Sequence, residues 1–339
     1  MADLFKPVVK ISALNPSFVT VMSHPAKEAT RGMMRETFKT FKDVDGNFIQ
    51  QFQTTGFDPR VFELYLHALF SALNFRVSRP KPAPDFLIEN KICSITVEAV
   101  VANPPDGFVP PKDDYVGKSL EGPLEQKQIE RFPEKMWNSL KAKLNKGYWR
   151  LPEVVNRPFI IAIQSFAHPS SLLHSEASMI SFIFGLTDLR WVQSESDTFE
   201  IQESDYLRPG FFNEAGSEYV SAIVFSNSGT TGKFSRMGQQ GSHRDAKVTI
   251  TRSGFCFDHT PHALLPAKFD YLVGDDRFIE TWDQGISVFH NPKALHPLPM
   301  GIFPGASWYE IGKDGLAAHF PDFHPFRSTT QTFYSGEVA

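Results

Sequence analysis

The sequence is poor in cysteine and has no long hydrophobic run, and both absences narrow the classes of protein that it can encode. Only Cys93 and Cys256 occur in 339 residues, which excludes a disulfide framework and a cysteine-type zinc site. No apolar segment approaches the ~18 residues of a membrane-spanning helix. Residues 1–18 show neither the apolar core nor the small-residue cleavage pattern of a secretory signal. We therefore expect a cytoplasmic protein.

No charge of one sign dominates the chain either. The formal net charge is -4, so contact with nucleic-acid phosphates would need a local basic patch rather than the charge of the whole surface. Phenylalanine is the residue type in excess, with 32 copies that are mostly scattered singly. This scatter favours a core packed with phenylalanine over an aromatic binding surface.

Residues 58–186 carry the strongest local patterns and predict a mixed α/β fold. Asp58 and Pro59 suit the start of a helix, and apolar residues follow them at helical spacing. The expected elements are a helix at 58–75, strands at 75–78, 85–89 and 94–102, a helix at 133–149, a strand at 157–166 and a helix at 175–186.

The flanking regions predict less regular structure. Residues 1–50 indicate an irregular lead-in, and "DVDGN" at 43–47 indicates a turn, because Thr54 stands where a calcium loop needs an acid. The segment 103–114 is rich in proline and predicts a surface loop. The remaining chain favours strands and long loops. We therefore expect a core at 1–190 and a β-rich C-terminal region at 191–339 packed on it.

Two acids stand on short apolar strands in "PDFLIENKICSITVEAV", residues 84–100. A buried carboxylate needs a partner or a cation, because an unpaired buried charge is costly. If the two strands form a hairpin, Asp85 and Glu98 reach the same end of the sheet, and Glu63 on the preceding helix can point to the same place. Three converging carboxylates predict a Mg²⁺ or Mn²⁺ site that activates a water molecule.

This order of a helix glutamate, "PD", an acid in "VEAV", a helix and a strand resembles the PD-(D/E)xK nuclease superfamily. The resemblance covers roughly residues 58–186. It implies the restriction-endonuclease-like fold, a mixed sheet with the order αβββαβ. It also implies Mg²⁺ bound by Asp85, Glu98 and Glu63, cleavage of nucleic acid with DNA favoured over RNA, and a fold compatible with a homodimer.

The sequence departs from the family pattern at one position. The pattern has lysine two residues after the acid, and Val100 stands there. We expect Lys143 on the following helix to replace it, with Lys135 and Lys146 contacting flanking phosphates. The apolar face of that helix should then meet Val97 and Ile160. These lysines could instead form a solvated face.

Two further sets of side chains are weaker candidates for phosphate contacts. Gln164, alone in an apolar strand, could orient a water or a phosphate, or could be a satisfied core amide. Lys233 and Arg236 lie in a glycine- and hydroxyl-rich segment at 225–244 that could clamp a substrate phosphate, although a flexible hairpin loop is the commoner meaning of such a segment.

Three functions remain open from the sequence. The first is a metal-dependent nuclease, and the second is a nuclease-like fold without chemistry that binds nucleic acid or a protein partner, which Val100 favours. The third is another metal-dependent hydrolase that uses the late histidines, although these lack zincin spacing. The chain is also similar to a family of uncharacterised bacterial proteins through "HNPKALHPLP" at 290–299 and "FHPF" at 323–326.

Overall fold

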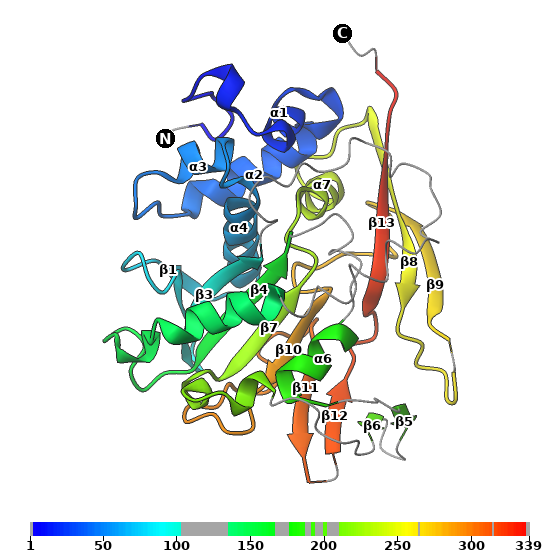
Figure 1. Cartoon of the computed structure of the whole chain (residues 1–339). Helices are drawn as coiled ribbons and strands as arrows, with labels where there is room; N and C mark the ends of the chain where they lie inside the picture. The colour runs from blue at the N-terminus through cyan, green and yellow to red at the C-terminus, as the bar shows by residue number, and fades with distance from the viewer. Residues whose placement is uncertain are drawn as a thin grey trace.

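A computed structural model of the chain defines the fold. It describes residues 3–102, 135–166, 176–186, 191–193, 199–201, 210–263, 265–313 and 315–336. The described residues form two β-sheets with helices on both faces of the larger one (Figure 1). No helix among them is both long and apolar enough to cross a membrane.

The larger sheet has ten strands and mixes parallel with antiparallel pairs. Its strands lie in the order β1 (Arg76–Ser78), β2 (Phe86–Glu89), β3 (Ser94–Ala102), β4 (Phe159–Ser165), β7 (Ala222–Ser226), β10 (Ile286–His290), β11 (Ser307–Gly312), β12 (Gly315–His319), β6 (Phe199–Ile201) and β5 (Trp191–Gln193). Strands β3, β4 and β7 are mutually parallel, whereas β10 is antiparallel to β7. The mixed α/β class predicted from the sequence is therefore confirmed. Because both halves of the chain contribute strands, the expected boundary near residue 190 does not separate two sheets.

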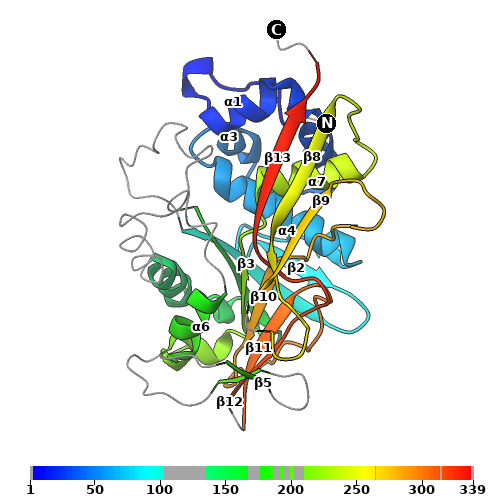
Figure 2. The ribbon, with the colours of Figure 1, turned by 90° about the vertical axis from the view of Figure 1, so that its right-hand side faces the viewer.

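The smaller sheet consists of three long antiparallel strands from the C-terminal half. It has the order β13 (Pro325–Tyr334), β8 (Val248–Cys256) and β9 (Ala267–Leu272), and Figure 2 shows it face on. Ile250 of β8 and Tyr271 of β9 are buried in a small cluster beneath it. The sheet covers one side of the molecule beside helix α7 (Thr231–Gln240).

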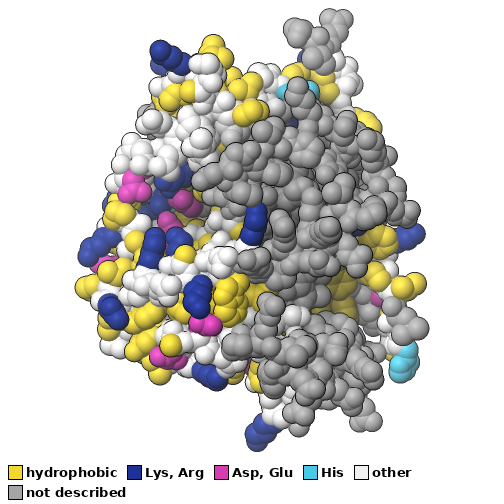
Figure 3. All heavy atoms as spheres, viewed as in Figure 1, with side chains coloured by type: hydrophobic (Ala, Val, Ile, Leu, Met, Phe, Trp, Pro, Cys, Tyr) yellow, Lys and Arg dark blue, Asp and Glu magenta, His cyan; other side chains and the backbone are white. Residues whose placement is uncertain are grey.

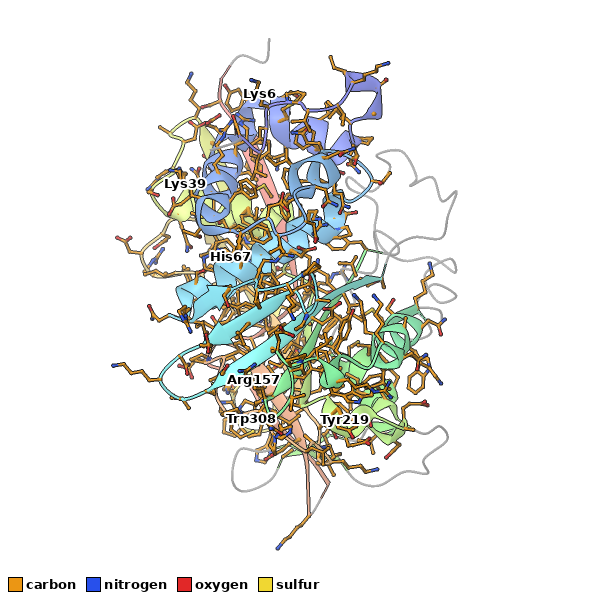
Figure 4. The ribbon with its side chains drawn as sticks, turned by 90° about the vertical axis from the view of Figure 1, so that its left-hand side faces the viewer. Lys6, Lys39, His67, Arg157, Tyr219 and Trp308 are labelled. Atoms are coloured by element: carbon orange, nitrogen blue, oxygen red, sulfur yellow. The ribbon has the colours of Figure 1, made fainter. Side chains whose placement is uncertain are left out.

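Helices form separate layers on the two faces of the large sheet. The N-terminal helices pack on one face and lie above the strands in Figure 4; they are α1 (Pro16–Ser23), α2 (Glu28–Thr40), α3 (Phe48–Gln53) and α4 (Phe57–Ala72). The helix at 135–145 and α6 (Ala177–Phe184) pack on the other face. Short 3-10 turns complete the chain at Ile11–Ala13, Pro25–Lys27, Tyr148–Arg150, Phe211–Asn213 and Ser217–Tyr219.

Strand β3 contributes side chains to both helical layers in alternation, because successive side chains of a strand point to opposite faces of the sheet. Val97 packs with the N-terminal helices, whereas Val100 packs with the helix at 135–145. The expected contact of that helix with Val97 and Ile160 is therefore wrong. Its apolar residues Met136, Leu140 and Leu144 meet the opposite face of the sheet.

Most of the expected order of elements at 58–186 agrees with the structure. Its helices and strands appear in the predicted sequence with slightly different ends, while 103–114 lies outside the described residues. The expected turn at 43–47 is confirmed, because the Asp43 carboxylate accepts hydrogen bonds from the Gly46 and Phe48 amides. The phenylalanine core is also confirmed, with 0% exposure of Phe18 and Phe52.

The N-terminal region differs from the expected irregular lead-in. Helix α2 is regular over Glu28–Thr40 and packs on α7, where the Thr30 and Ser235 hydroxyls are 2.6 Å apart. Its composition is polar, but Ala29, Met34 and Phe38 are buried on one face, and the packing of this amphipathic face supplies most of the stability of the helix.

Candidate active site

A polar pocket of about 490 Å³ opens between α4, the start of β2, β3 and the helix at 135–145. We call it the acidic pocket. Its lining includes the three acids singled out from the sequence, Glu63, Asp85 and Glu98, together with Lys143 and Tyr148. Figure 3 shows basic and acidic side chains gathered on the left of this face of the molecule.

Asp85 and Glu98 come together because their strands pair. Phe86 pairs with Val97 in the antiparallel β2–β3 ladder, which places the two acids directly opposite each other. The Glu98 carboxylate accepts a hydrogen bond from the Asp85 amide at 3.3 Å, and the Asp85 carboxylate accepts one from the Ala99 amide at 2.8 Å. The predicted meeting of these two acids at one end of the sheet is confirmed.

Lys143 reaches the same carboxylate from the neighbouring helix. Its ammonium lies 2.5 Å from Glu98 Oε1, and the Tyr148 hydroxyl donates to that oxygen at 2.8 Å. Val100 is two residues after Glu98 and so points to the same face, where the helix at 135–145 packs. The structure therefore places Lys143 on the side to which a lysine at position 100 would point.

Glu63 lines the pocket but already has two cationic partners. Arg60 Nη1 contacts both of its carboxylate oxygens, at 2.7 and 2.9 Å, and Arg79 Nη2 lies 3.2 Å from Oε2. Arg79 also lies 3.6 Å from Asp85 Oδ1. In the part of the chain that the structure describes, no group of three or more His, Cys, Asp or Glu side chains could hold a metal ion. Arg60 and Arg79 thus balance the charge of Glu63 where it lines the pocket.

Burial and charge act together on the acids of the pocket. Burial first, and then the charges of Glu98 and Glu63, raise the pKa of Asp85 well above its ordinary value. Burial also raises the pKa of Glu63, although Arg60 and Arg79 oppose that shift. Two facing carboxylates at Asp85 and Glu98 thus repel each other, and a hard cation between them would relieve that repulsion.

Of the two lysines expected to contact flanking phosphates, one lines the pocket and the other does not. Lys146 is exposed, lines the pocket and lies 5.8 Å from the centre of the Tyr148 ring. Ser139 also lines the pocket. Lys135 is half-buried and does not belong to the described lining, so the structure does not support its predicted contact with a phosphate at this pocket.

Three other predicted residues lie elsewhere. Gln164 is fully buried, and its side-chain amide exchanges hydrogen bonds with the Gly229 backbone, so it is a satisfied core amide. Lys233 is fully buried against Glu280 at 2.7 Å and cannot meet a nucleic-acid phosphate. Arg236 also pairs with Glu280, at 2.7 Å, and is outside the acidic pocket. Burial, which depends on distant parts of the chain, removes Lys233 from contact with substrate and leaves Gln164 as the core amide that the sequence allowed.

Sequence reasoning missed Arg60, Arg79 and Tyr148. Arg60 had a usable signal, because it precedes Glu63 by three residues on one helix and such pairs meet on the helix surface. Arg79 and Tyr148 had none, since their contacts depend on the packing of separate elements. No protein-family model matches this chain, and neither a curated protein nor a solved structure resembles it significantly.

Proposed function

We propose that the protein is a Mg²⁺- or Mn²⁺-dependent phosphodiesterase that cleaves nucleic acid at the acidic pocket, with DNA favoured as the substrate. The observation that carries this proposal is the approach of the Lys143 ammonium to within 2.5 Å of Glu98, beside Asp85, in an accessible pocket. The PD-(D/E)xK resemblance and its restriction-endonuclease-like core belong to the same proposal.

The donor set fits a hard divalent cation. Mg²⁺ is commonly held in proteins by one or two carboxylates, with water and substrate phosphate as the remaining ligands. Asp85 and Glu98 supply two facing carboxylates, and burial first, then the charges of Glu98 and Glu63, raise the pKa of Asp85. When bound, the cation would supply a nucleophilic water and charge stabilisation.

The protein's own residues would divide the remaining work. The Lys143 ammonium stands where it can stabilise negative charge that develops on the scissile phosphate. Lys146 at the rim can contact a neighbouring phosphate. Arg60 and Arg79 hold Glu63 in place, and the Tyr148 hydroxyl holds Glu98, so these three act as positioning residues.

The second candidate is a nuclease-like fold that binds nucleic acid or a protein partner without cleaving. The observation that favours it is that Glu63 and Glu98 already have cationic partners, at Arg60 and Lys143 respectively. Such pairs satisfy the acids without a metal. The two candidates differ in whether divalent cations promote cleavage.

A cleavage assay separates them. Purified protein is incubated with DNA and RNA substrates in Mg²⁺, Mn²⁺ or EDTA. We expect cation-dependent cleavage that Asp85→Asn abolishes, because a ligand is lost. Lys143→Ala should lower the rate about 100-fold, which is the effect of removing one well-placed donor to a developing charge.

Lys141 provides a matched control on the same helix, because it pairs with Glu214 at 3.1 Å and not with the acidic pocket. Lys141→Ala should cleave at the wild-type rate. Folded wild-type protein that binds DNA or RNA but cleaves neither, in either cation, would support the binding fold instead.

A further inference from the structure

A second cavity, of about 350 Å³, lies at the carboxyl end of β7, between the start of α7 and β13. The loop after β7 and the start of α7 contribute Ser228, Thr230 and Gly232 to its wall. The cavity lies beside β10, which reverses the run of parallel strands β3, β4 and β7. In open α/β sheets, ligands commonly bind outside the carboxyl ends of the strands.

The wall of this cavity carries an excess of buried positive charge. Arg236 and Arg252 line it and are buried, and Lys233 lies directly behind them. These three cations share one carboxylate, Glu280, at 2.7 Å from Lys233, 2.7 Å from Arg236 and 3.4 Å from Arg252. Glu280 sets one negative charge against three positive charges, and Glu176, the acid in the wall itself, lies beside His324, so a local positive surplus remains that would attract an anion.

The start of α7 adds backbone donors on the same side. Thr230 is its N-cap residue, and its side chain makes no capping hydrogen bond. The first amides of a helix have no partner within the helix and favour an anion. Gly232 lies in this first turn, where an added Cβ would stand 3.4 Å from Thr230 Oγ1 and 3.5 Å from Arg236 Nη1.

His324 gives an independent sign of a ligand. It lines the cavity and is only 1% exposed. Its Nε2 lies 3.1 Å from a Glu176 oxygen, while its Nδ1 is buried without a hydrogen-bond partner. A buried polar atom seldom stays unpaired, because the lost hydrogen bond is costly. A ligand in the cavity would give this Nδ1 atom the polar partner that it lacks.

We propose that this cavity, hereafter the cationic cavity, binds the phosphate group of a small phosphorylated molecule. The volume exceeds the need of a free ion and falls in the range of small-molecule pockets. Gln164 serves this site indirectly, because its amide clamps Gly229 in the loop that leads to α7. An added Cβ on Gly229 would stand 2.5 Å from the Phe62 ring, so the loop fits only with glycine there.

Calorimetric titrations in EDTA at constant ionic strength test this proposal without the divalent cation that the nuclease proposal requires. The probes are inorganic phosphate, pyrophosphate and adenosine 5′-monophosphate, with adenosine as the ligand that lacks phosphate. We expect one saturable site for at least one phosphate-bearing probe, and none for adenosine. Tighter binding of the nucleotide than of inorganic phosphate would show that the rest of the molecule also contacts the cavity.

A charge placed at Gly232 provides the decisive variant. Gly232→Asp puts a carboxylate at the start of α7, which favours the helix and competes with the bound anion. We expect its affinity to fall about tenfold or more, with no loss of thermal stability. Gly232→Asn matches it in size without the charge and should bind more tightly than the aspartate variant. The proposal would be overturned if no phosphate probe showed saturable binding to the wild type. It would also be overturned if Gly232→Asp bound the probes with wild-type affinity.

Discussion

The acidic pocket and the cationic cavity use similar side chains in opposite proportions. In the acidic pocket, three carboxylates meet Arg60, Arg79 and Lys143, so the charges balance, yet Asp85 and Glu98 still face each other. In the cationic cavity, Glu280 faces three cations, while Glu176 in the wall pairs with His324. The first arrangement suits the cation that we propose for it, and the second suits the proposed anion.

The lysines of the two sites differ more in their exposure to solvent than in their sequence context. Lys143 lies on an amphipathic helix and reaches a pocket. Lys233 lies in a segment rich in glycine and hydroxyls, which is typical of a phosphate-binding loop, yet its side chain is fully buried. Burial lowers the pKa of Lys233 to about 8, although Glu280 opposes that shift. A lysine therefore indicates a phosphate contact only when its side chain is exposed to the site.

The largest expected change in stability comes from removing the carboxylate shared by the three cations of the cationic cavity. Glu280→Gln removes the carboxylate shared by three buried cations, and leaving such charges unpaired should cost about 3–5 kcal/mol of unfolding free energy. Chemical denaturation would measure this loss. The double variant Glu280→Gln/Lys233→Met should recover part of it, because one cation leaves with the carboxylate.

Asp270 on β9 provides the control for this comparison, since its side chain is exposed. Asp270→Asn should change the free energy of unfolding by less than about 0.5 kcal/mol. A Glu280→Gln protein as stable as the Asp270→Asn protein would show that the three cations do not depend on Glu280.

Removing an acid from the acidic pocket should change the free energy of unfolding by less and in the opposite direction, as a gain in stability. Asp85→Asn removes one of two repelling acids and can keep the hydrogen bond from the Ala99 amide. We expect the metal-free variant to gain about 1 kcal/mol at neutral pH, as often happens when a strained functional residue is replaced. Denaturation of both proteins in EDTA would measure it.

The pH dependence of this gain follows from the raised pKa of Asp85. A carboxyl group whose pKa is higher in the folded than in the unfolded state stabilises the fold below its ordinary pKa. That stability is lost as the pH rises through the folded-state pKa. The advantage of Asp85→Asn should therefore grow from about pH 4 upward, and an advantage independent of pH would mean that the acid is not strained.

Much of the first half could be predicted from the sequence because its signals are local. Helix α4 follows from its apolar spacing, and β2 and β3 follow from short apolar runs between turns. Helix α7 could not be predicted, because its glycines and hydroxyl residues disfavour a helix. It is stabilised from outside: Gly238 packs so closely on α2 that an added Cβ would stand 2.3 Å from the Ala29 carbonyl oxygen.

In the candidate site too, the features that depend on tertiary packing could not be predicted from the sequence. Asp85, Glu98 and Lys143 could be brought together by reasoning from strand pairing and helix periodicity, and the structure places them in contact. The arginine partners that tie Glu63 could not be weighed in advance. Whether a carboxylate is free for a metal depends on every side chain that packs beside it, and Arg79 comes from a different element.

The measurement that bears most directly on the proposed activity is a crystal of the wild-type protein soaked in Mn²⁺ and examined for anomalous density. We predict a peak between the Asp85 and Glu98 carboxylates, which would be absent in Asp85→Asn crystals and present in Asp270→Asn crystals treated in the same way. Wild-type crystals with ordered Asp85 and Glu98 side chains and no peak between them would contradict a metal-dependent site in the acidic pocket.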